Sequence, residues 1–355
     1  MEIAKIKSLF VSTDITIKQA MQKINETAEK ILFVVDEKEK LLGTVTDGDI
    51  RRGIVSGLEF NVSVKSIMQK EFAAITNNTP QLKEHAKKMM FETRLEHIPV
   101  VDERNNLLDV ILWTDFIEED AVKEKHLYAN QVVIMAGGKG TRLDPFTKVL
   151  PKPLIPIGDR PIIDIIMEKF YKYGFHKFIY TLNYKKEYIK LFLKDNKFPY
   201  TVDWVEESDF CGTAGSLSLI KDKVKEPFFV TNCDSLLNID LEEVLSWHTE
   251  QKAAMTIIGC HNEVEIPFGT LQFNNGRLAS ISEKPVYDLT INTGVYVMEP
   301  RILSYISTGK RIDMNELINL VLRNEKITVF PIYEGWFDMG QWKKYIESTK
   351  KLEMF

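Results

Sequence analysis

An ungapped internal repeat is the feature that most constrains the fold of this chain. Residues 31–37 read ILFVVDE and residues 97–103 read HIPVVDE, an offset of 66 positions. At the same offset, LLGTV at 41–45 aligns with LLDVI at 107–111. Each copy has apolar residues at helical spacing followed by two short apolar runs, which predicts a helix, a strand, a turn and a second strand. Two such copies in tandem predict a repeated module at the N-terminal end.

The repeat resembles a tandem pair of CBS domains, one over residues 1–60 and the other over residues 61–120. The resemblance implies a disc with pseudo-two-fold symmetry that binds adenine nucleotides in its clefts. In that family an aspartate holds the ribose hydroxyls, and a nearby serine or threonine contacts the phosphate. The residues that fill these positions are Thr46 and Asp49 in the first copy and Thr114 and Asp115 in the second.

The second copy departs from the first at two positions in this region. Asp109 stands where the first copy has Gly43, and Leu112 stands where it has Thr46. We therefore expect nucleotide binding in the first cleft more than in the second. The alternative is a scaffold or dimerisation disc whose aspartates only cap the helices that follow them.

The pattern of charged and apolar residues changes after residue 120. Residues 121–130 are rich in charge and predict a linker, and from residue 131 apolar runs alternate with amphipathic stretches. Alternation of this kind predicts an α/β sheet with helices on both faces over residues 131–355.

The overall composition excludes some classes of function. A formal net charge of −5 and an isoelectric point near 5.8 argue against a nucleic-acid binder, which needs a basic face. The first residues lack the apolar core of a signal peptide, and no later run is long enough to span a membrane. We therefore expect a cytoplasmic protein that does not bind membranes. The three scattered cysteines predict free thiols in a reducing compartment.

A glycine-rich turn follows the first strand of the second part, at Val132–Met135. Gly137, Gly138 and Gly140 let the backbone approach an anion and direct several N–H groups at it. The spacing is neither that of a Walker A loop nor that of the dinucleotide fingerprint. The turn therefore predicts an anion-binding loop of another kind.

The continuation of this loop carries a second resemblance. GGKGTRL at 137–143 and PKP at 151–153 match the signature of the sugar-phosphate nucleotidyltransferase family, and the resemblance covers residues 131–355. It implies a Rossmann-like mixed sheet of the GT-A-like kind, with Arg142 on the β- and γ-phosphates and Lys152 on the α-phosphate as catalytic residues. The positions that it implies for nucleotide binding are Ala136, Gly137, Gly138, Gly140, Thr141, Asn183, Gly212 and Thr213.

Two aspartates are candidates for a metal site. Asp234 ends the apolar strand PFFVTN, and the carboxyl end of a parallel strand is where open α/β sheets bind ligands. By the resemblance, Asp338 is the second metal ligand, and the cofactor is Mg²⁺, which prefers an oxygen-rich octahedral shell. Asp234 is also a catalytic residue by the resemblance. The alternative is that both aspartates cap the segments that follow them.

The resemblance also implies a sugar-phosphate pocket. Glu283 accepts hydrogen bonds from sugar hydroxyls, Lys284 neutralises the sugar phosphate, and both follow a hairpin with an Asn274-Asn275-Gly276 turn. The full set of positions implied for the sugar phosphate is Gly215, Gly269, Glu283, Lys284 and Asn292. The alternatives are an exposed ion pair for Glu283 and Lys284 and a turn residue for Asn292.

The substrates follow from the branch of the family. The sequence PKPLIPI and the CBS fusion are similar to the guanylyltransferases, particularly the glucosamine-1-phosphate type of bacterial legionaminic-acid synthesis. We therefore expect GTP and glucosamine 1-phosphate as substrates and a homo-oligomer, with mannose 1-phosphate as the alternative sugar. A hypothesis of another class is a nucleotide sensor with an inactive transferase domain. The retained Arg142, Lys152, Asp234, Lys284 and Asp338 argue against it.

Overall fold

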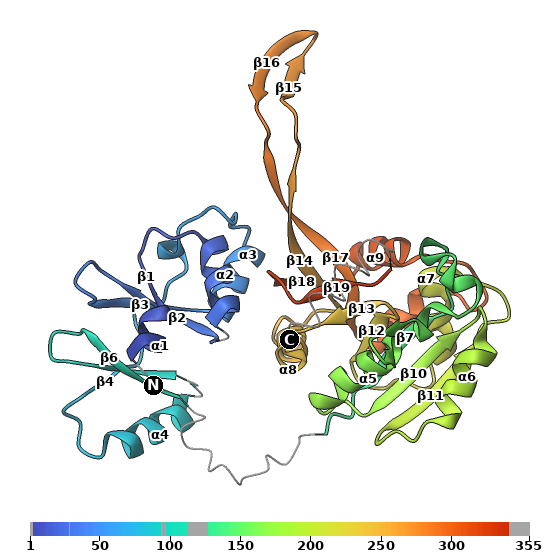
Figure 1. Cartoon of the computed structure of the whole chain (residues 1–355), viewed down its shortest axis with the longest axis horizontal. Helices are drawn as coiled ribbons and strands as arrows, with labels where there is room; N and C mark the ends of the chain where they lie inside the picture. Colours follow the sequence, from blue (N-terminus) through green and yellow to red (C-terminus); the bar gives the residue numbers. More distant parts are fainter. Residues whose placement is uncertain (1–2, 28, 94, 96, 113–126, 341–355) are drawn as a thin grey trace. The chain divides into compact units, whose positions relative to one another are not determined.

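The computed structural model describes residues 3–27, 29–93, 95, 97–112 and 127–340. The chain divides into two compact units, residues 1–123 and residues 124–355 (Figure 1). In the described part of the chain no helix has the length and apolar character needed to cross a membrane.

The first unit contains two copies of one strand–helix–strand–strand motif. The short helix α1 (Ile3–Ser8) precedes them. The first copy consists of β1 (Phe10–Val11), α2 (Ile17–Thr27), β2 (Ile31–Val35), β3 (Leu41–Thr46) and α3 (Asp47–Val55). The described residues of the second copy include β4 (Ile75–Thr76), α4 (Leu82–Thr93), β5 (His97–Val101) and β6 (Leu107–Leu112). The sheets β1-β2-β3 and β4-β5-β6 have the same order.

The strand register repeats the offset seen in the sequence. Phe33 pairs with Thr44 in the first copy, and Pro99 pairs with Val110 in the second, each 66 positions further on. The irregularity before Val35 recurs before Val101. Side chains of both copies pack into one shared core, which includes Ile31, Phe33, Leu41, Val101, Leu107 and Val110. The predicted repeat is therefore one folded unit with two equivalent halves.

A mixed seven-stranded sheet forms the centre of the second unit, in the order β11-β10-β7-β12-β17-β14-β18. Its strands are β7 (Val132–Ala136), β10 (Lys177–Leu182), β11 (Thr201–Glu206), β12 (Phe228–Asn232), β14 (Met255–Glu265), β17 (Val286–Met298) and β18 (Ile327–Ile332). The strands β7, β10, β11 and β12 are parallel, whereas β17 runs antiparallel to both β12 and β14. The predicted Rossmann-like mixed sheet is confirmed.

Helices cover both faces of this sheet because its central strands are apolar on both sides. Val132 and Ile134 of β7 pack in one core with α5 (Ile162–Lys172), α6 (Lys186–Asp195) and α8 (Leu241–Glu250). Val133 of the same strand faces a second core with α7 (Gly212–Gly215) and α9 (Met314–Leu322).

The strand order reverses at β7, which places the loop after β7 beside the loop after β12. The chain passes from β7 outward to β10 and β11 and then returns to β12 on the other side of β7. Met135 and Asn232, near the ends of β7 and β12, are register partners. Ligands in open α/β sheets bind outside the carboxyl ends of the strands at such a reversal. An active site is therefore expected at this edge.

Three two-stranded sheets in the described residues of the second unit lie outside the central sheet. The pairs β8 (Pro156–Ile157) with β9 (Arg160–Pro161) and β13 (Ser235–Leu237) with β19 (Trp336–Asp338) are antiparallel. A further pair, β15 (Thr270–Asn274) with β16 (Arg277–Ser282), lies at the tip of a ribbon that β14 and β17 extend away from the sheet (Figure 1).

Candidate active site

The glycine-rich loop leaves β7 at the buried Ala136 and stays close to two neighbouring segments. The backbone N–H of Tyr184 donates to the carbonyl of Gly137 at 3.3 Å. Gly140 has φ +69°, and a Cβ on it would lie 2.9 Å from the Cβ of Lys152. Only glycine fits that close approach without strain. Gly138 has nothing within 4 Å of its own Cβ position, so that side of the loop is open.

The second half of the loop is held by Lys185. The Nζ of Lys185 donates to the carbonyls of Thr147, Lys148 and Val149 at 3.3, 2.6 and 2.9 Å. These bonds fix the segment between Arg142 and Lys152. Arg142 itself lies in the short 3-10 helix η3 (Thr141–Leu143), where its side chain and that of Thr141 are exposed. The loop therefore presents Arg142 to solvent on a fixed backbone.

Lys152 and Asp234 form an ion pair at the carboxyl edge of the sheet. Lys152 begins the 3-10 helix η5 (Lys152–Leu154), and Asp234 follows β12. The Nζ of Lys152 donates to Oδ2 of Asp234, and their side chains are only 11% and 9% exposed. Burial of this kind strengthens the electrostatic interaction of both groups with a bound anion or cation.

Asp338 reaches the same place from far along the chain. The antiparallel pairing of β13 with β19 places Ser235 opposite Asp338, and the N–H of Met339 donates to the carbonyl of Asp234 at 2.9 Å. The Oδ1 of Asp338 accepts from the N–H of Gly340 at 2.7 Å. Backbone pairing therefore brings the two predicted metal aspartates together.

The space at Gly340 tests whether these carboxylates suit a divalent cation. A Cβ on Gly340 would collide with Oδ2 of Asp234, and it would lie 2.9 Å from Oδ1 of Asp338 and 3.2 Å from Nζ of Lys152. Glycine at this position thus leaves room between two carboxylate oxygens. Oxygen ligands with room for phosphate and water suit Mg²⁺, so the residues fit that ion.

The thiol next to Asp234 is not a candidate nucleophile. Cys233 is unpaired and buried, and burial raises the pKa of its thiol to about 12. A thiol with that pKa stays protonated at neutral pH.

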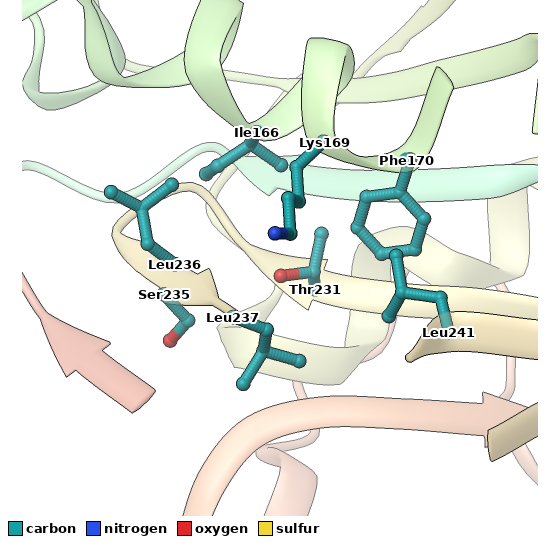
Figure 2. A pocket seen from close by; sticks show the side chains of 8 residues that line it. All are labelled: Ile166, Lys169, Phe170, Thr231, Ser235, Leu236, Leu237 and Leu241. Atoms are coloured by element: carbon teal, nitrogen blue, oxygen red, sulfur yellow. The ribbon is translucent and has the colours of Figure 1, made fainter. Parts of the chain in front are cut away.

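A small cavity of about 10 Å³ lies on the α5 side of β12, lined by Lys169, Thr231 and Leu241 among others (Figure 2). It has room for about one water and not for a substrate.

A buried glutamate lies against the other side of the glycine-rich loop. A Cβ on Gly137 would be 2.7 Å from Oε2 of Glu207 and 3.3 Å from the Cβ of Asn183. The N–H of Cys211 donates to Oε1 of Glu207 at 3.2 Å. Burial raises the pKa of Glu207, although hydrogen bonds from Cys211 and Asn183 oppose that shift. Gly137 and Asn183, both predicted to bind the nucleotide, are thus neighbours of a carboxylate.

The Gly212–Gly215 segment is interlocked with the start of α9. The N–H of Thr213 donates to Oδ1 of Asp313 at 2.9 Å, and its hydroxyl accepts from the N–H of Met314 at 2.8 Å. Gly212 has φ +83°, and a Cβ on it would meet the carbonyl of Ile312 at 2.5 Å. Gly215 is buried against Cys211 and Lys310. These contacts give all three residues a packing role, and their predicted contacts with substrate stay predictions.

Besides Gly215, the predicted sugar-phosphate residues fall into two places. Asn292 is exposed on β17 within the sheet, where its Oδ1 accepts from the N–H of Gly294 at 2.9 Å and its Nδ2 donates to the hydroxyl of Tyr296 at 2.9 Å. Gly269, Glu283 and Lys284 are exposed on the ribbon that projects from the sheet (Figure 1). The structure therefore places Asn292 in the central sheet and the other three residues on the ribbon.

In the first copy of the repeat, Asp49 is part of a helix cap. Thr46 is the N-cap of α3 and forms a capping box with Asp49. Oδ1 of Asp49 also accepts from Arg52 at 2.7 Å and from Gln69 at 2.9 Å. Burial alone would raise the pKa of Asp49, but its hydrogen bonds from Thr46, Gln69 and Arg52 hold it below the ordinary value. Thr114 and Asp115, predicted for the second cleft, lie outside the described residues.

Two family profiles match the chain. The profile described as "Nucleotidyl transferase" matches residues 131–354, and the profile described as "CBS domain" matches residues 2–56 and 64–121. The chain belongs to the nucleotidyl transferase family. It carries a CBS domain pair before the nucleotidyl transferase domain, so both resemblances stated from the sequence are confirmed.

Curated relatives of this nucleotidyl transferase differ in the base that their names specify. It is 30% identical over 243 residues to a "Probable glucose-1-phosphate cytidylyltransferase" of Bacillus subtilis, a match that covers 62% of this chain and 95% of that protein. It is 29% identical over 226 residues to a "Mannose-1-phosphate guanyltransferase" of Yarrowia lipolytica. That second match covers 61% of this chain and 62% of the relative, less than two thirds of its length.

Solved structures resemble the nucleotidyl transferase domain. HddC from Yersinia pseudotuberculosis is 26% identical with a TM-score of 0.51, and the match covers 63% of this chain and 99% of that one. A "Putative Glucose-1-Phosphate Thymidylyltransferase" from Bacillus anthracis is 22% identical with a TM-score of 0.52 over 64% of this chain and 96% of that one, which shows the shared fold.

Sequence reasoning missed two residues that contact the glycine-rich loop or its continuation. Glu207 follows β11, a parallel strand next to β10, so the argument that found Asp234 could have found it. Lys185 gave no such signal, because its role depends on an αL backbone with φ 50° and on three carbonyls more than thirty residues earlier in the chain.

Proposed function

We propose that this chain transfers a guanylyl group from GTP to glucosamine 1-phosphate and releases pyrophosphate. The observation that carries the proposal is the meeting of Lys152, Asp234 and Asp338 beside the glycine-rich loop. A cation, two carboxylates and an anion-binding loop suit a reaction between two phosphates, where charge neutralisation and positioning lower the barrier. The product is then a GDP-sugar for bacterial surface sugars of the legionaminic-acid type.

The reaction needs no proton acceptor on the protein. An oxygen of the sugar phosphate attacks the α-phosphorus, the bond from that phosphorus to the bridging oxygen breaks, and pyrophosphate leaves with the electron pair. The attacking oxygen is already ionised at neutral pH. We assign Lys152 to the charge on the α-phosphate and the exposed Arg142 to the leaving pyrophosphate.

We also propose Mg²⁺ as the cofactor, bound by Asp234 and Asp338. When bound, this ion supplies Lewis-acid neutralisation of the phosphate oxygens. The two aspartates contribute by fixing the position of their oxygens through the β13–β19 pairing. Lys152 neutralises part of their charge before the substrates bind.

Glu207 favours guanine among the bases. The Watson–Crick edge of guanine has two adjacent donors, N1–H and the N2 amine, and a carboxylate accepts from both. Adenine, cytosine and uracil offer no such pair of adjacent donors. Glu207 adjoins Gly137 and Asn183, the predicted nucleotide contacts. The HddC structure, whose title names a complex with GMP-PN, supports the same choice.

The variant Glu207→Gln tests this choice of base. We expect kcat/KM for GTP to fall by about 10- to 100-fold relative to the other triphosphates, the loss that a charge-assisted hydrogen bond typically gives. The measurement is competition between triphosphates in a pyrophosphate-release assay. Glu206→Gln is a matched control, because Glu206 instead pairs with Lys186 at 2.8 Å and Lys190 at 3.0 Å. A Glu207→Gln enzyme with unchanged base preference would remove Glu207 from the base site.

We propose further that the CBS pair binds an adenine nucleotide and regulates the transferase. Binding in the first cleft requires that Arg52 and Gln69 give up Oδ1 of Asp49 to the ribose hydroxyls. A ligand then changes activity only if it binds two arrangements of the module with different affinity.

Asp49→Asn tests the sensing site, because it keeps the size of the side chain and removes its charge. We expect the affinity for AMP to fall by about tenfold or more, with uninhibited turnover close to wild type. Calorimetry of the full chain with AMP and ATP measures this, and Asp36→Asn on the exposed β2–β3 turn is the control. Equal AMP affinity in both variants would leave Asp49 as a helix cap only.

A further inference from the structure

Lys185 joins the end of β10 to the loop that carries Arg142 and Lys152. It lies just beyond the last residue of β10, Leu182, and forms the N-cap of α6 with φ 50° and ψ 35°. Residues other than glycine rarely adopt this left-handed conformation, and they keep it where the surrounding structure demands it. The contacts of Lys185 and its neighbours therefore hold its backbone in place.

The side-chain ammonium of Lys185 is fully hydrogen-bonded within the protein. A lysine ammonium has three N–H donors. Here the main-chain carbonyls of residues 147–149 accept from it at 3.3, 2.6 and 2.9 Å. The rings of Tyr184 and Tyr188 lie 5.6 and 5.9 Å from Nζ, within the range of a cation–π contact. Because all three donors are used, Lys185 takes part in the reaction only through the loop that it holds.

The anchored residues support the backbone of both proposed catalytic cations. Thr147 is only 1% exposed, and its hydroxyl lies 3.1 Å from the carbonyl of Gly140 and 2.6 Å from Oδ1 of Asp144. Gly140 is in turn confined, because a Cβ on it would lie 3.0 Å from Cγ2 of Thr147 and 2.9 Å from Cβ of Lys152. Arg142 lies between Gly140 and Asp144 in the chain. A displacement of Thr147 is therefore transmitted to both cations.

The two residues before Lys185 contact the first half of the same loop. The N–H of Tyr184 donates to the carbonyl of Gly137 at 3.3 Å. A Cβ on Gly137 would lie 3.3 Å from Cβ of Asn183 and 2.7 Å from Oε2 of Glu207. Three consecutive residues thus touch the proposed base site on one side and the anchor of the proposed catalytic cations on the other.

We propose that Lys185 is a positioning residue for nucleotidyl transfer, a role that rests on the proposed function. Its three hydrogen bonds fix Arg142 and Lys152 relative to the base site, so that the phosphates of a bound triphosphate meet both cations. Catalysis that depends on positioning is sensitive to small shifts, and a displacement of about 1 Å caused by a distant change can lower a rate about a hundredfold.

Two substitutions of Lys185 separate positioning from stability. Lys185→Met removes the ammonium and keeps the length of the side chain, whereas Lys185→Gly also removes the ammonium but suits the positive φ. Glycine should therefore give the higher melting temperature, while the turnover numbers of both variants should fall by about tenfold or more. Turnover that follows the melting temperature would make Lys185 a residue of the fold only and overturn the proposal.

Lys221→Met is the matched control for these variants. The Nζ of Lys221 donates to the carbonyl of Ile306 at 2.7 Å, which is a bond from a lysine to the main chain outside the glycine-rich loop. Its turnover number and its affinity for pyrophosphate should be close to those of the wild type. A fall as large as that of Lys185→Met would show that the effect is not specific to the loop, and it would overturn the proposal.

The affinity for pyrophosphate gives a measurement that a loss of stability alone does not change. Arg142 is assigned to the leaving pyrophosphate, so Lys185 acts on this affinity through Arg142. We expect Lys185→Met to weaken pyrophosphate binding about tenfold in the wild-type background and to have little further effect in Arg142→Met. Calorimetry of the full chain with pyrophosphate and Mg²⁺ measures all four proteins. Equal weakening in both backgrounds would contradict the assigned role.

Amide hydrogen exchange separates this inference from the proposed function, because it requires no substrate. Residues 137–152 of the full chain should exchange faster in Lys185→Met than in the wild type, while α5 should exchange at the same rate in both. A loop that exchanges as in the wild type would overturn the role of Lys185 whatever the substrates are. Faster exchange and weaker pyrophosphate binding in an enzyme that prefers a triphosphate other than GTP would refute the proposed guanylyl transfer and keep Lys185 as a positioning residue.

Discussion

Asp234→Asn is expected to lower the turnover number at least about a hundredfold at saturating Mg²⁺, the effect typical of losing a major electrostatic element. Asparagine has nearly the same shape, so the change is mainly the loss of charge. The Asp234 carboxylate pairs with Lys152. Together with the Asp338 carboxylate, it borders the space at Gly340. Initial rates of pyrophosphate release over a range of Mg²⁺ concentrations measure the effect.

Asp240→Asn is the matched control for this variant. Asp240 is the N-cap of α8, where its Oδ1 accepts from the N–H groups of Glu242 and Glu243 at 3.0 and 3.2 Å. Asparagine caps helices about as well as aspartate, so both turnover and stability should stay near wild type. Turnover of Asp234→Asn equal to that of this control would remove Asp234 from the active site.

Lys152→Met is expected to lower the turnover number by two orders of magnitude or more, with a smaller change in KM for the triphosphate. The charge of Lys152 matters most while negative charge builds on the α-phosphate. Because Lys152 pairs with Asp234 in a nearly buried site, the double variant with Asp234→Asn should lose less than the product of the two single losses. Steady-state kinetics of all three variants give both quantities.

Lys172→Met is the control for the charge change alone. Lys172 is 65% exposed on α5 and pairs only weakly with Glu168 across one helical turn at 3.1 Å. The turnover number of the Lys172→Met enzyme should be close to that of the wild type. A Lys152→Met enzyme with unchanged turnover and a raised KM for the triphosphate would assign Lys152 to ground-state binding instead of catalysis.

Features carried by local pattern could be predicted from the sequence. The repeat offset is present in the strand register, because a two-residue side-chain period fixes the pairing of a half-buried strand. The glycine-rich loop follows β7 at the reversal of strand order, as its pattern after a buried strand indicated. The Asn275-Gly276 turn is a hairpin for the same local reason.

Features that depend on distant partners could not be predicted. The sequence did not indicate that Oδ1 of Asp49 accepts hydrogen bonds from Arg52 and Gln69, the latter twenty residues away. These bonds decide whether that oxygen is available to a ribose hydroxyl. The hairpin at Asn275 was evident, but its projection from the sheet follows from how far the β14–β17 ladder extends. The resemblance implied Gly269, Glu283 and Lys284 as sugar-phosphate residues, which stays a prediction, and it gave no sign that they lie on a projecting ribbon.

The most direct test of the proposed guanylyltransferase is pyrophosphate release by the full chain, with each of four nucleoside triphosphates against a panel of sugar 1-phosphates. We expect GTP with glucosamine 1-phosphate to give the highest kcat/KM, with dependence on Mg²⁺. The same rate ranking should be lost in the Glu207→Gln variant. Release that is absent with every pair, or highest with a pyrimidine triphosphate, would contradict the account.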